Sequence, residues 1–474
     1  MIHVIGGGLA GSEAAWQAAA RGVPVTLHEM RPVRTTAVHR TDRLAELVCS
    51  NSFRGAALHN AVGLLKEEMR RLDSLVMRVA DASRVPAGGA LAVDRDRFAE
   101  GITGAIEREP RITVRRGEVP RLPAAPDSDA PVSGSPVIVA TGPLTSESLA
   151  ADLTAFVGRE QLYFFDAISP IVEAPTIDQS KVFRASRRGR GSRVATSVGP
   201  ACGADPNEGD YLNCPMTEAE YVRFHEALVT AERAELHDFD RTPFFEGCLP
   251  VEVMAHRGLD TLRYGPMKPV GLTDPRTGGR PWAVVQLRQD DLAADHFSLV
   301  GFQTQLKWGE QKRVLRLVPG LEQAEFVRFG MLHRNTYINA PTVLLPTWQT
   351  RTRPDLFIAG QVSGVEGYVE SAASGLVAGR NAAAVALGET PRALPRTTAL
   401  GALAYYVSHA APSTYQPANI AFGLIPSLDA PPRGRQARRQ AMARRALADL
   451  ETWMAGDRPA DRSSEDAAAA AVAP

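Results

Sequence analysis

Apolar and polar positions follow a strand–helix–strand pattern over the first thirty residues. Residues 2–5 (IHVI) form a short apolar run, residues 10–21 have the composition of a helix, and residues 24–28 (PVTLH) form a second apolar run. Short apolar runs of this length are typical of buried strands. The pattern therefore predicts the first β-α-β unit of an α/β protein.

Three glycines lie between the first strand and the helix with the spacing G-x-G-x-x-G. Gly6 permits a tight turn, Gly8 lets the backbone approach a pyrophosphate, and Gly11 lets the helix pack on the strand. The N-terminus of the helix then presents free N–H groups to that anion. Glu29 ends the second strand, 18 residues after Gly11, where a carboxylate can accept hydrogen bonds from a ribose. The unit predicts a bound dinucleotide and leaves NAD and FAD open. Its candidate cofactor-binding residues are Gly6, Gly7, Gly8, Leu9, Ala10, Gly11 and Glu29.

Two later stretches show the same kind of pattern as the first thirty residues. Residues 135–146 (SPVIVATGPLTS) are an apolar run that leads into Ala-Thr-Gly, and residues 356–383 pass from an apolar run through a glycine turn into a small-residue helix. Both patterns fit a sheet whose edge closes over a dinucleotide, the second with another helix N-terminus near the ligand. They add three candidate cofactor-binding residues, Gly142, Gly360 and Gln361.

The nucleotide-binding domain is therefore predicted to be split by a large insertion. By analogy at the level of the fold, such a split is more typical of FAD enzymes than of NAD dehydrogenases. We predict an α/β protein whose Rossmann-like FAD-binding domain is interrupted by an α+β insertion domain. The predicted boundaries are 1–155 and 331–395 for the two parts of the FAD-binding domain, 156–330 for the insertion domain, 396–455 for a C-terminal helical segment and 456–474 for a disordered tail.

The predicted insertion contains one well-marked helix. Thr217 and Glu220 have the spacing of a capping box, in which each side chain bonds the backbone N–H of the other residue. Tyr221, Phe224 and Leu228 follow at helical spacing and line one face. We therefore expect a helix that begins after Thr217 and buries this face.

Composition limits the class of protein. The chain has 474 residues, 44% of them hydrophobic and 22% charged, which is ordinary for a soluble globular protein. No run approaches the roughly 20 apolar residues of a membrane span, and a first strand at residue 2 leaves no room for a signal peptide. The 53 basic and 53 acidic residues cancel, which argues against a protein that coats nucleic acid indiscriminately but leaves a local basic face possible.

Four cysteines, none in a C-x-x-C pair, are too few for a disulfide scaffold and make a structural zinc site improbable. We expect a cytoplasmic protein with free thiols and no metal. Cys49 lies in LVCSNSFRG, among polar neighbours that suit the rim of a flavin site. Cys248 lies in FFEGCLPVEVMA, between a glycine and a proline that favour an exposed turn. The alternative for either thiol is a small buried hydrophobic side chain.

At this point the chain resembles the FAD- and folate-dependent tRNA (uracil-5-)-methyltransferases, the TrmFO family, which is related to the GidA-like flavoproteins. The resemblance covers nearly the whole chain in order. It rests on VIGGGLAGSEAAWQ, LVCSNSFRG, DYLNCPMTEAEY, FFEGCLPVEVMA, YGPMKPVGL, AVVQLRQDD, VGFQTQLKWGEQKRV, FVRFGMLHRNTYINAP, GQVSGVEGYVESAASG and YQPANIAFGLIP.

The resemblance implies that C5 of uridine 54, in the T-loop of tRNA, is methylated. Methylenetetrahydrofolate would supply the one-carbon unit, reduced FAD the electrons, and NADH or NADPH the reduction of FAD. Uracil C5 is a poor nucleophile until a thiolate adds at C6, and a base must then remove the C5 proton. By resemblance, Cys248 is the nucleophile, Cys49 is the base beside the flavin, and Cys214 is structural.

Four residues in family-like motifs are candidate folate ligands, because guanidinium groups can pair with the glutamate carboxylates of folate. An ordinary structural ion pair is the alternative for each of them. These residues are Arg288, Gln289, Arg334 and Asn335. Other functions also stay open: a GidA-like enzyme acting on the wobble uridine, the same methylation on ribosomal RNA, a plain NAD(P)H:flavin oxidoreductase, and an RNA-binding protein without chemistry.

Overall fold

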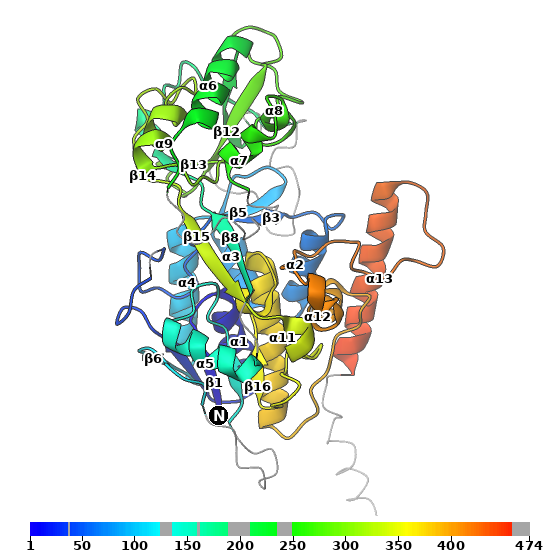
Figure 1. Cartoon of the computed structure of the whole chain (residues 1–474). Helices are drawn as coiled ribbons and strands as arrows, with labels where there is room; N and C mark the ends of the chain where they lie inside the picture. Colours follow the sequence, from blue (N-terminus) through cyan, green and yellow to red (C-terminus); the bar gives the residue numbers. More distant parts are fainter. Residues whose placement is uncertain (37, 124–134, 159–161, 188–208, 235–248, 457–474) are drawn as a thin grey trace, which may run out of the picture.

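A computed structural model describes residues 1–36, 38–123, 135–158, 162–187, 209–234 and 249–456. The described chain has a nucleotide-binding part, drawn in the lower half of Figure 1, and an insertion above it that contains α6, α9 and β12. The strands β8 (Leu162–Ala167) and β15 (Leu332–Tyr337) pair antiparallel and carry the chain into and out of the insertion.

The nucleotide-binding part is built on a five-stranded parallel sheet of order β16-β7-β1-β2-β6. Its strands are β1 (Ile2–Ile5), β2 (Val25–Glu29), β6 (Ile112–Arg116), β7 (Val137–Val139) and β16 (Leu356–Ile358). The three apolar runs of the sequence, near residues 2, 135 and 356, therefore become adjacent strands. The predicted α/β class with a Rossmann-like sheet is confirmed.

The helices α1 (Leu9–Ala20) and α11 (Tyr368–Ala386) pack closely against each other. A Cβ atom at Gly375 would lie 2.1 Å from the carbonyl oxygen of Ala10, and one at Gly379 would lie 2.4 Å from that of Ala14. The two glycines therefore let the backbones touch, which draws the two halves of the split domain together.

The nucleotide-binding part also contains a second, smaller sheet and several helices. The three-stranded sheet has the order β3-β5-β4, and the 3-10 helix η4 follows β16. The bounds are β3 (Ser52–Gly55), β4 (Arg84–Val85), β5 (Ala90–Val93), α2 (Ala61–Arg71), α3 (Leu75–Ala82), α4 (Arg95–Arg108), α5 (Glu147–Val157), α10 (Ala340–Val343) and η4 (Gln361–Ser363).

The insertion is an antiparallel six-stranded sheet of order β10-β11-β12-β13-β9-β14. The bounds of its elements are β9 (Ile171–Glu173), η1 (Ala174–Thr176), β10 (Phe183–Arg184), β11 (Tyr211–Met216), α6 (Glu218–Thr230), α7 (Val251–His256), α8 (Thr261–Tyr264), β12 (Ala283–Gln289), β13 (His296–Leu299), α9 (Trp308–Leu315) and β14 (Phe326–Arg328). Every strand of this sheet lies inside the insertion proposed from sequence, residues 156–330.

The helix predicted after Thr217 is α6, and its capping box is present. The hydroxyl of Thr217 accepts the backbone N–H of Glu220, whose carboxylate accepts the N–H of Thr217 at 2.8 Å. Tyr221, Phe224 and Leu228 are buried in a core shared with β11, β12 and α9. The sheet face turned toward α6 and α9 is therefore apolar.

The C-terminal segment packs on the nucleotide-binding part through α12 (Ala399–His409), and α13 (Arg435–Ala455) runs along its side in Figure 1. The short helix η5 (Pro412–Thr414) follows α12. The buried carboxylate of Glu68 accepts the backbone N–H groups of Ala399 and Leu400 at 2.7 and 2.9 Å and so fixes the start of α12. The tail predicted to be disordered, 456–474, lies outside the described residues except for its first position.

Candidate functional site

A cavity opens at the carboxyl ends of all five parallel strands, the edge where α/β sheets bind their ligands. It encloses about 1050 Å³, its open mouth included. Its walls are the loops that follow β1, β2, β6, β7 and β16. The residues predicted to bind the cofactor that line it are Gly6, Gly7, Gly8, Leu9, Ala10, Glu29, Gly142, Gly360 and Gln361.

The glycine loop has the shape that a pyrophosphate requires. A Cβ atom at Gly6 would lie 2.5 Å from the carbonyl oxygen of Ala140, and one at Gly11 would lie 1.8 Å from that of Gly6, so neither position tolerates a side chain. Gly11 packs the helix on the strand and does not line the cavity. No atom lies within 4 Å of a Cβ at Gly8, which stands at the N-terminus of α1. The open side of this loop fits an anionic group held by helix N–H groups.

Glu29 lies at the end of β2 and is held by Gly7 and Arg31. Its carboxylate accepts the backbone N–H of Gly7 at 2.9 Å and the Nε–H of Arg31 at 2.9 Å. Burial raises the pKa of Glu29, but the hydrogen bonds from Arg31 and Gly7 outweigh it and keep the pKa below its usual value. Glu29 is therefore an anion. It accepts four hydrogen bonds, from the backbone N–H groups of Gly7 and Arg31 and from Nε and Nη2 of Arg31, which is about the number of acceptor sites that a carboxylate offers.

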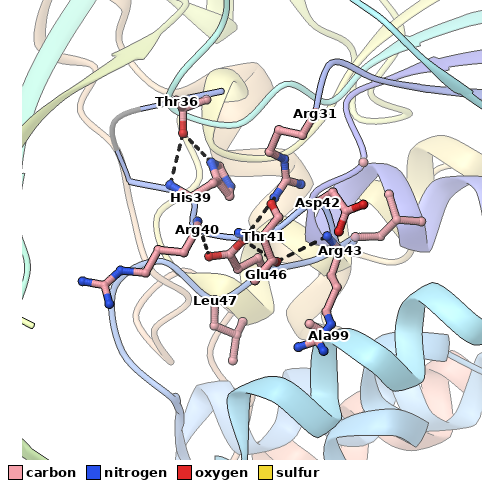
Figure 2. Close-up of polar contacts among 12 residues, drawn as sticks. Arg31, Thr36, His39, Arg40, Thr41, Asp42, Arg43, Glu46, Leu47 and Ala99 are labelled. Carbon is pink, nitrogen blue, oxygen red and sulfur yellow. Dashed lines mark hydrogen bonds and ion pairs between the residues drawn. The ribbon is translucent and has the colours of Figure 1, made fainter. Parts of the chain in front are cut away.

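The same arginine links Glu29 to a loop at the cavity wall. Figure 2 shows Arg31 and this loop, residues 36 and 38–46. The Nη1 of Arg31 lies 3.2 Å from a carboxylate oxygen of Glu46, which also accepts the hydroxyl and the N–H of Thr41 at 2.8 and 3.0 Å. His39 lines the cavity, and its Nδ1 lies 2.7 Å from the Thr36 hydroxyl. Burial, followed by the charge of Arg31, lowers the pKa of His39 to about 4. His39 is therefore neutral at pH 7.

The loop that carries Cys49 is fastened by its backbone to the second half of the split domain. The hydroxyl of Tyr368 accepts the N–H groups of Cys49 and Ser50 at 2.7 and 3.1 Å. Tyr368 lines the dinucleotide cavity, as does Val48, and Cys49 is half-buried next to them. Burial, followed by the charge of the Cys49 thiolate, raises the pKa of Tyr368, so it stays a neutral phenol. The thiol predicted to be a base is thus adjacent to the predicted cofactor cavity.

The Cys49 loop also contacts the sheet of the insertion. The side-chain amide of Asn51 donates to the carbonyl oxygens of Val93 and Gln289 at 3.0 Å each. Its oxygen accepts the Nε–H of Arg288 at 2.8 Å. Asn51 therefore joins Cys49, two residues earlier, to strand β12.

Two buried arginines, Arg288 and Arg328, and the half-buried Arg95 bring positive charge to Cys49. Arg95 donates to the carbonyl oxygen of Cys49 at 3.3 Å and is paired with Asp290 at 2.8 Å. Burial lowers the pKa of Arg288 and Arg328, and the Cys49 thiolate opposes that effect in both, which places them within electrostatic range of the sulfur. Arg328 makes no side-chain hydrogen bond or ion pair with any residue that the structure describes. Surplus positive charge of this kind favours a thiolate.

The four residues predicted to bind folate lie on two strands. Arg288 and Gln289 end β12, where the amide of Gln289 donates to the carbonyl oxygen of Asp291 at 2.7 Å. Arg334 and Asn335 lie on β15, paired with β8, and the structure does not describe the side chain of Arg334. Asn335 is fully buried, and neither its Nδ2 nor its Oδ1 has a hydrogen-bond partner among the described residues.

The predictions for the two other cysteines, Cys214 and Cys248, have different outcomes. Cys214 is fully buried on β11, and burial raises the pKa of its thiol, as a structural cysteine requires. Cys248 lies outside the described residues, so its predicted exposed turn and its role stay predictions. Across the described ranges, no three His, Cys, Asp or Glu residues gather as metal ligands, and no helix has the length and apolarity to cross a membrane.

The structure brings Tyr368, Arg95 and Arg328 to the candidate site, and sequence reasoning did not single out any of them. Tyr368 and Arg328 stand in the motifs GQVSGVEGYVESAASG and FVRFGMLHRN, which were recognised only as wholes. A tyrosine directly after a glycine turn, and an arginine inside an apolar strand, were the available signals. Nothing local indicated that they would face Cys49.

Comparison with known proteins agrees with this geometry. The profile of the family described as "Glucose inhibited division protein A" matches residues 1–390. The methylenetetrahydrofolate–tRNA-(uracil-5-)-methyltransferase TrmFO of Symbiobacterium thermophilum is 58% identical over 459 residues, which cover 96% of this chain and 97% of that protein. The TrmFO protein of Enterococcus faecalis is 55% identical over 446 residues, which cover 94% of this chain and 97% of that protein.

Among solved structures, GidA of Aquifex aeolicus in its form II crystal has a TM-score of 0.66 and covers 95% of this chain and 73% of its own. At 20% sequence identity this likeness shows the fold alone. It shows that the arrangement of a split α/β domain around an insertion also exists in a solved structure.

Proposed function

Because the chain belongs to the TrmFO family of methylenetetrahydrofolate–tRNA-(uracil-5-)-methyltransferases, we propose that it forms 5-methyluridine in tRNA, with methylenetetrahydrofolate as one-carbon donor and FAD as cofactor. The observation that carries this proposal is the 58% identity over 96% of the chain. The geometry supports it independently, since a thiol loop lies between a dinucleotide cavity and the sheet of the insertion.

We place FAD in the cavity at the ends of the parallel strands. Gly8 and the N-terminus of α1 would face its pyrophosphate, and Glu29, which lines the same cavity, would accept a ribose hydroxyl in place of one of the hydrogen bonds it receives from Arg31. Tyr368 and Val48 line the same cavity next to Cys49, which puts the thiol near the bound cofactor. When bound, reduced FAD supplies the electrons that turn a methylene group into a methyl group.

We assign the two thiols different tasks in the reaction. The thiolate of Cys248 adds to C6 of uracil and makes C5 nucleophilic. C5 then bonds the methylene carbon that the folate donates. Cys49 takes the C5 proton, for which it must be a thiolate beforehand, and the bond between C6 and Cys248 breaks to release the Cys248 thiolate. Arg95, Arg288 and Arg328 support the thiolate state of Cys49, because all three interact electrostatically with it. Only Arg95 has an ion-pair partner among the described residues.

Asn335 does not line the dinucleotide cavity, but its amide, unsatisfied among the residues that the structure describes, supports a ligand contact on β15. A buried amide with no hydrogen-bond partner costs roughly 1–3 kcal/mol for each group, and both atoms of this amide are unpaired in the described chain. A pterin ring presents adjacent donors and acceptors that could satisfy both atoms. Folate is therefore the ligand we propose for Asn335, with Arg288, Gln289 and Arg334 as further candidates from sequence.

Finer parts of the proposal rest on family resemblance. These are the choice of uridine 54 in the T-arm, the use of NADH or NADPH as electron donor, and action in the cytoplasm. A GidA-like modification of the wobble uridine and methylation of ribosomal RNA are the alternatives. The solved structure of GidA shares the fold at 20% identity, too low to favour its substrate.

The test is reconstitution with a defined RNA. Purified protein loaded with FAD is incubated with unmodified tRNA, NADPH and methylenetetrahydrofolate, and nucleosides are identified by mass spectrometry. We expect 5-methyluridine, none of it in tRNA whose uridine 54 is replaced by cytidine. Methylation driven by S-adenosylmethionine alone would contradict the proposal. Modification restricted to the wobble uridine or to ribosomal RNA would instead favour one of the alternatives.

A further inference from the structure

A second cavity lies where the insertion meets the nucleotide-binding part, apart from the dinucleotide cavity. It encloses about 940 Å³, its open mouth included, and is lined on the insertion side by Arg187, Tyr211, Lys268 and Gln286. The turn between β4 and β5, residues 88–89, forms the opposite wall. The cavity therefore exists only because two parts of the chain meet there.

Hydrogen bonds hold the two walls together. The hydroxyl of Tyr211 donates to the carbonyl oxygen of Ala87 at 2.9 Å, and the N–H of Gly88 donates to the carboxylate of Asp210 at 2.5 Å. A Cβ atom at Gly89 would have no atom within 4 Å, so this side of the turn is open. The hydrogen bond to Ala87 therefore fixes the position of the Tyr211 ring in the cavity wall.

The cavity carries an excess of positive charge. Arg187 donates through Nη2 to the carbonyl oxygen of Pro266 at 3.1 Å, and its buried Nε has no partner among the described residues. Burial lowers the pKa of Arg187 to about 10, which leaves it charged at pH 7. Lys268 is exposed and makes no ion pair with any residue that the structure describes, while the carboxylate of Asp210 accepts the N–H of Gly88. The unpaired N–H donors of Arg187 and Lys268 favour binding of an anion.

The cavity is also next to the Cys49 loop. Gln286 and Arg288 lie two positions apart on β12 and so share one face of the sheet, about 7 Å apart along the strand. Tyr211 stands opposite Arg288 on the neighbouring strand β11. Arg288 contacts Asn51, two residues after Cys49. The cavity wall at Gln286 therefore lies two β12 positions from the arginine that contacts the Cys49 loop, within reach of an extended ligand that reacts beside Cys49.

We propose that this cavity holds the glutamate tail of the folate substrate, with its carboxylates on Arg187 and Lys268. The assignment rests on the proposed function and adds a tail site that differs from the residues expected from sequence. A folate tail is an aromatic ring followed by carboxylates, and the cavity offers the Tyr211 ring followed by two cations. Arg288 contacts Asn51 and Ser298 and does not line this cavity, so the tail site does not depend on it.

The test compares folates with one and with three glutamates. Binding of tetrahydrofolate mono- and triglutamate to the FAD-loaded full chain is measured by equilibrium dialysis. We expect the unaltered protein to bind the triglutamate more tightly than the monoglutamate. Arg187→Gln and Lys268→Gln should each weaken binding of the triglutamate about tenfold. Because Lys268 is exposed, Lys268→Gln tests the site without risk to folding. Arg313→Gln is the matched control, since Arg313 is an exposed cation on α9 paired with Glu310.

Three outcomes would overturn the assignment. The variants could bind both folates as the unaltered protein does. They could instead lose affinity for tRNA, measured by filter binding, with folate affinity intact, which would make the cavity an RNA phosphate site. The triglutamate could also show no advantage in the unaltered protein. Absence of any folate binding by the unaltered protein is a separate result, because it would contradict the proposed function itself.

Discussion

The hydroxyl of Tyr368 lies 2.7 Å from the backbone nitrogen of Cys49 and accepts its hydrogen bond. This contact joins residues 319 positions apart. It ties the thiol loop of the first half of the split domain to the N-terminal end of α11 in the second half. The position of Cys49 thus depends on correct assembly of the whole nucleotide-binding part.

We predict that Tyr368→Phe misplaces Cys49 without removing the thiol. The change deletes the acceptor for two backbone N–H groups, those of Cys49 and Ser50. Each lost hydrogen bond costs about 1 kcal/mol of unfolding free energy. We expect a drop in kcat for methylation larger than this stability loss explains, and slower alkylation of Cys49 by iodoacetamide across the pH range.

The control for this prediction is Tyr406→Phe, which removes a hydrogen bond to the carbonyl oxygen of Gln416 on the surface. It should lower stability slightly and leave methylation and alkylation unchanged. Equal effects of the two variants on kcat would show that Tyr368 has no special role in positioning Cys49.

Gly8→Val should give folded protein that has lost its yellow colour. A side chain at this position meets no protein atom within 4 Å, so the fold has room for it. The same side chain occupies the space in which the pyrophosphate approaches the N-terminus of α1. Visible absorbance of the purified protein measures bound flavin, and circular dichroism measures folding.

Gly309→Val is the matched control, because Gly309 also has no atom within 4 Å of a Cβ and lies near the N-terminus of another helix, α9. It should keep the flavin. A Gly8→Val variant with a full flavin spectrum would mean that the pyrophosphate lies elsewhere.

The glycine loop and the Cys49 site differ in how far sequence could predict them. The loop could be predicted because its requirements are local: Gly6, Gly8 and Gly11 lie within six residues, and Glu29 follows one helix later. The environment of Cys49 could not, because it is made by α4, β12 and α11, whose relative packing no local pattern specifies. Arg288 illustrates this, since no local pattern indicated its contact with Asn51, 237 positions away.

Asn335→Leu should stabilise the protein and weaken folate binding. The buried amide has no hydrogen-bond partner among the described residues, so its removal ends a desolvation cost of roughly 1–3 kcal/mol. Urea unfolding of the FAD-loaded protein without folate should therefore show an unchanged or increased free energy of unfolding. Equilibrium dialysis should show at least tenfold weaker binding of tetrahydrofolate.

The contrasting variant is Asn381→Leu. Asn381 is also buried, but its amide donates to Thr347 and Arg392 and accepts the N–H of Arg392 at 2.8 Å. This variant should be destabilised and should bind folate normally. If Asn335→Leu were destabilised to the same degree, Asn335 would be an ordinary structural residue.

Stability should fall as the pH is lowered from about 6.5 toward 4, with His39 as one cause. The pKa of His39 is lowered to about 4 from an ordinary 6.5, so the folded chain holds this imidazole neutral while the unfolded chain protonates it. Above pH 6.5 both states are neutral and no cost arises. Below it the unfolded state gains protons, and the cost reaches about 3 kcal/mol near pH 4, since one pKa unit corresponds to about 1.4 kcal/mol.

His39→Gln should remove this part of the pH dependence. Urea unfolding at pH 7.5, 6 and 5 is compared between the unaltered protein and the variant, both loaded with FAD. Other groups also titrate in this range, so the difference between the two slopes is the signal. Parallel slopes would show that His39 titrates normally in the folded protein.

Cys248→Ala and Cys49→Ala should fail at different steps. Without Cys248 no thiolate adds to C6, so we expect neither methylation nor a covalent complex with 5-fluorouridine RNA. Without Cys49 the addition remains possible, and because fluorine at C5 cannot leave as a proton does, the complex should still form while methylation is lost.

The loop itself should survive in Cys49→Ala, because Tyr368 and Arg95 hold it through backbone atoms. A gel shift stable to denaturant measures the complex, and Cys214→Ala, which alters a buried structural thiol, should still form it. If Cys214→Ala failed to trap the RNA and Cys248→Ala succeeded, the nucleophile would be Cys214 on β11 and our assignment would be wrong.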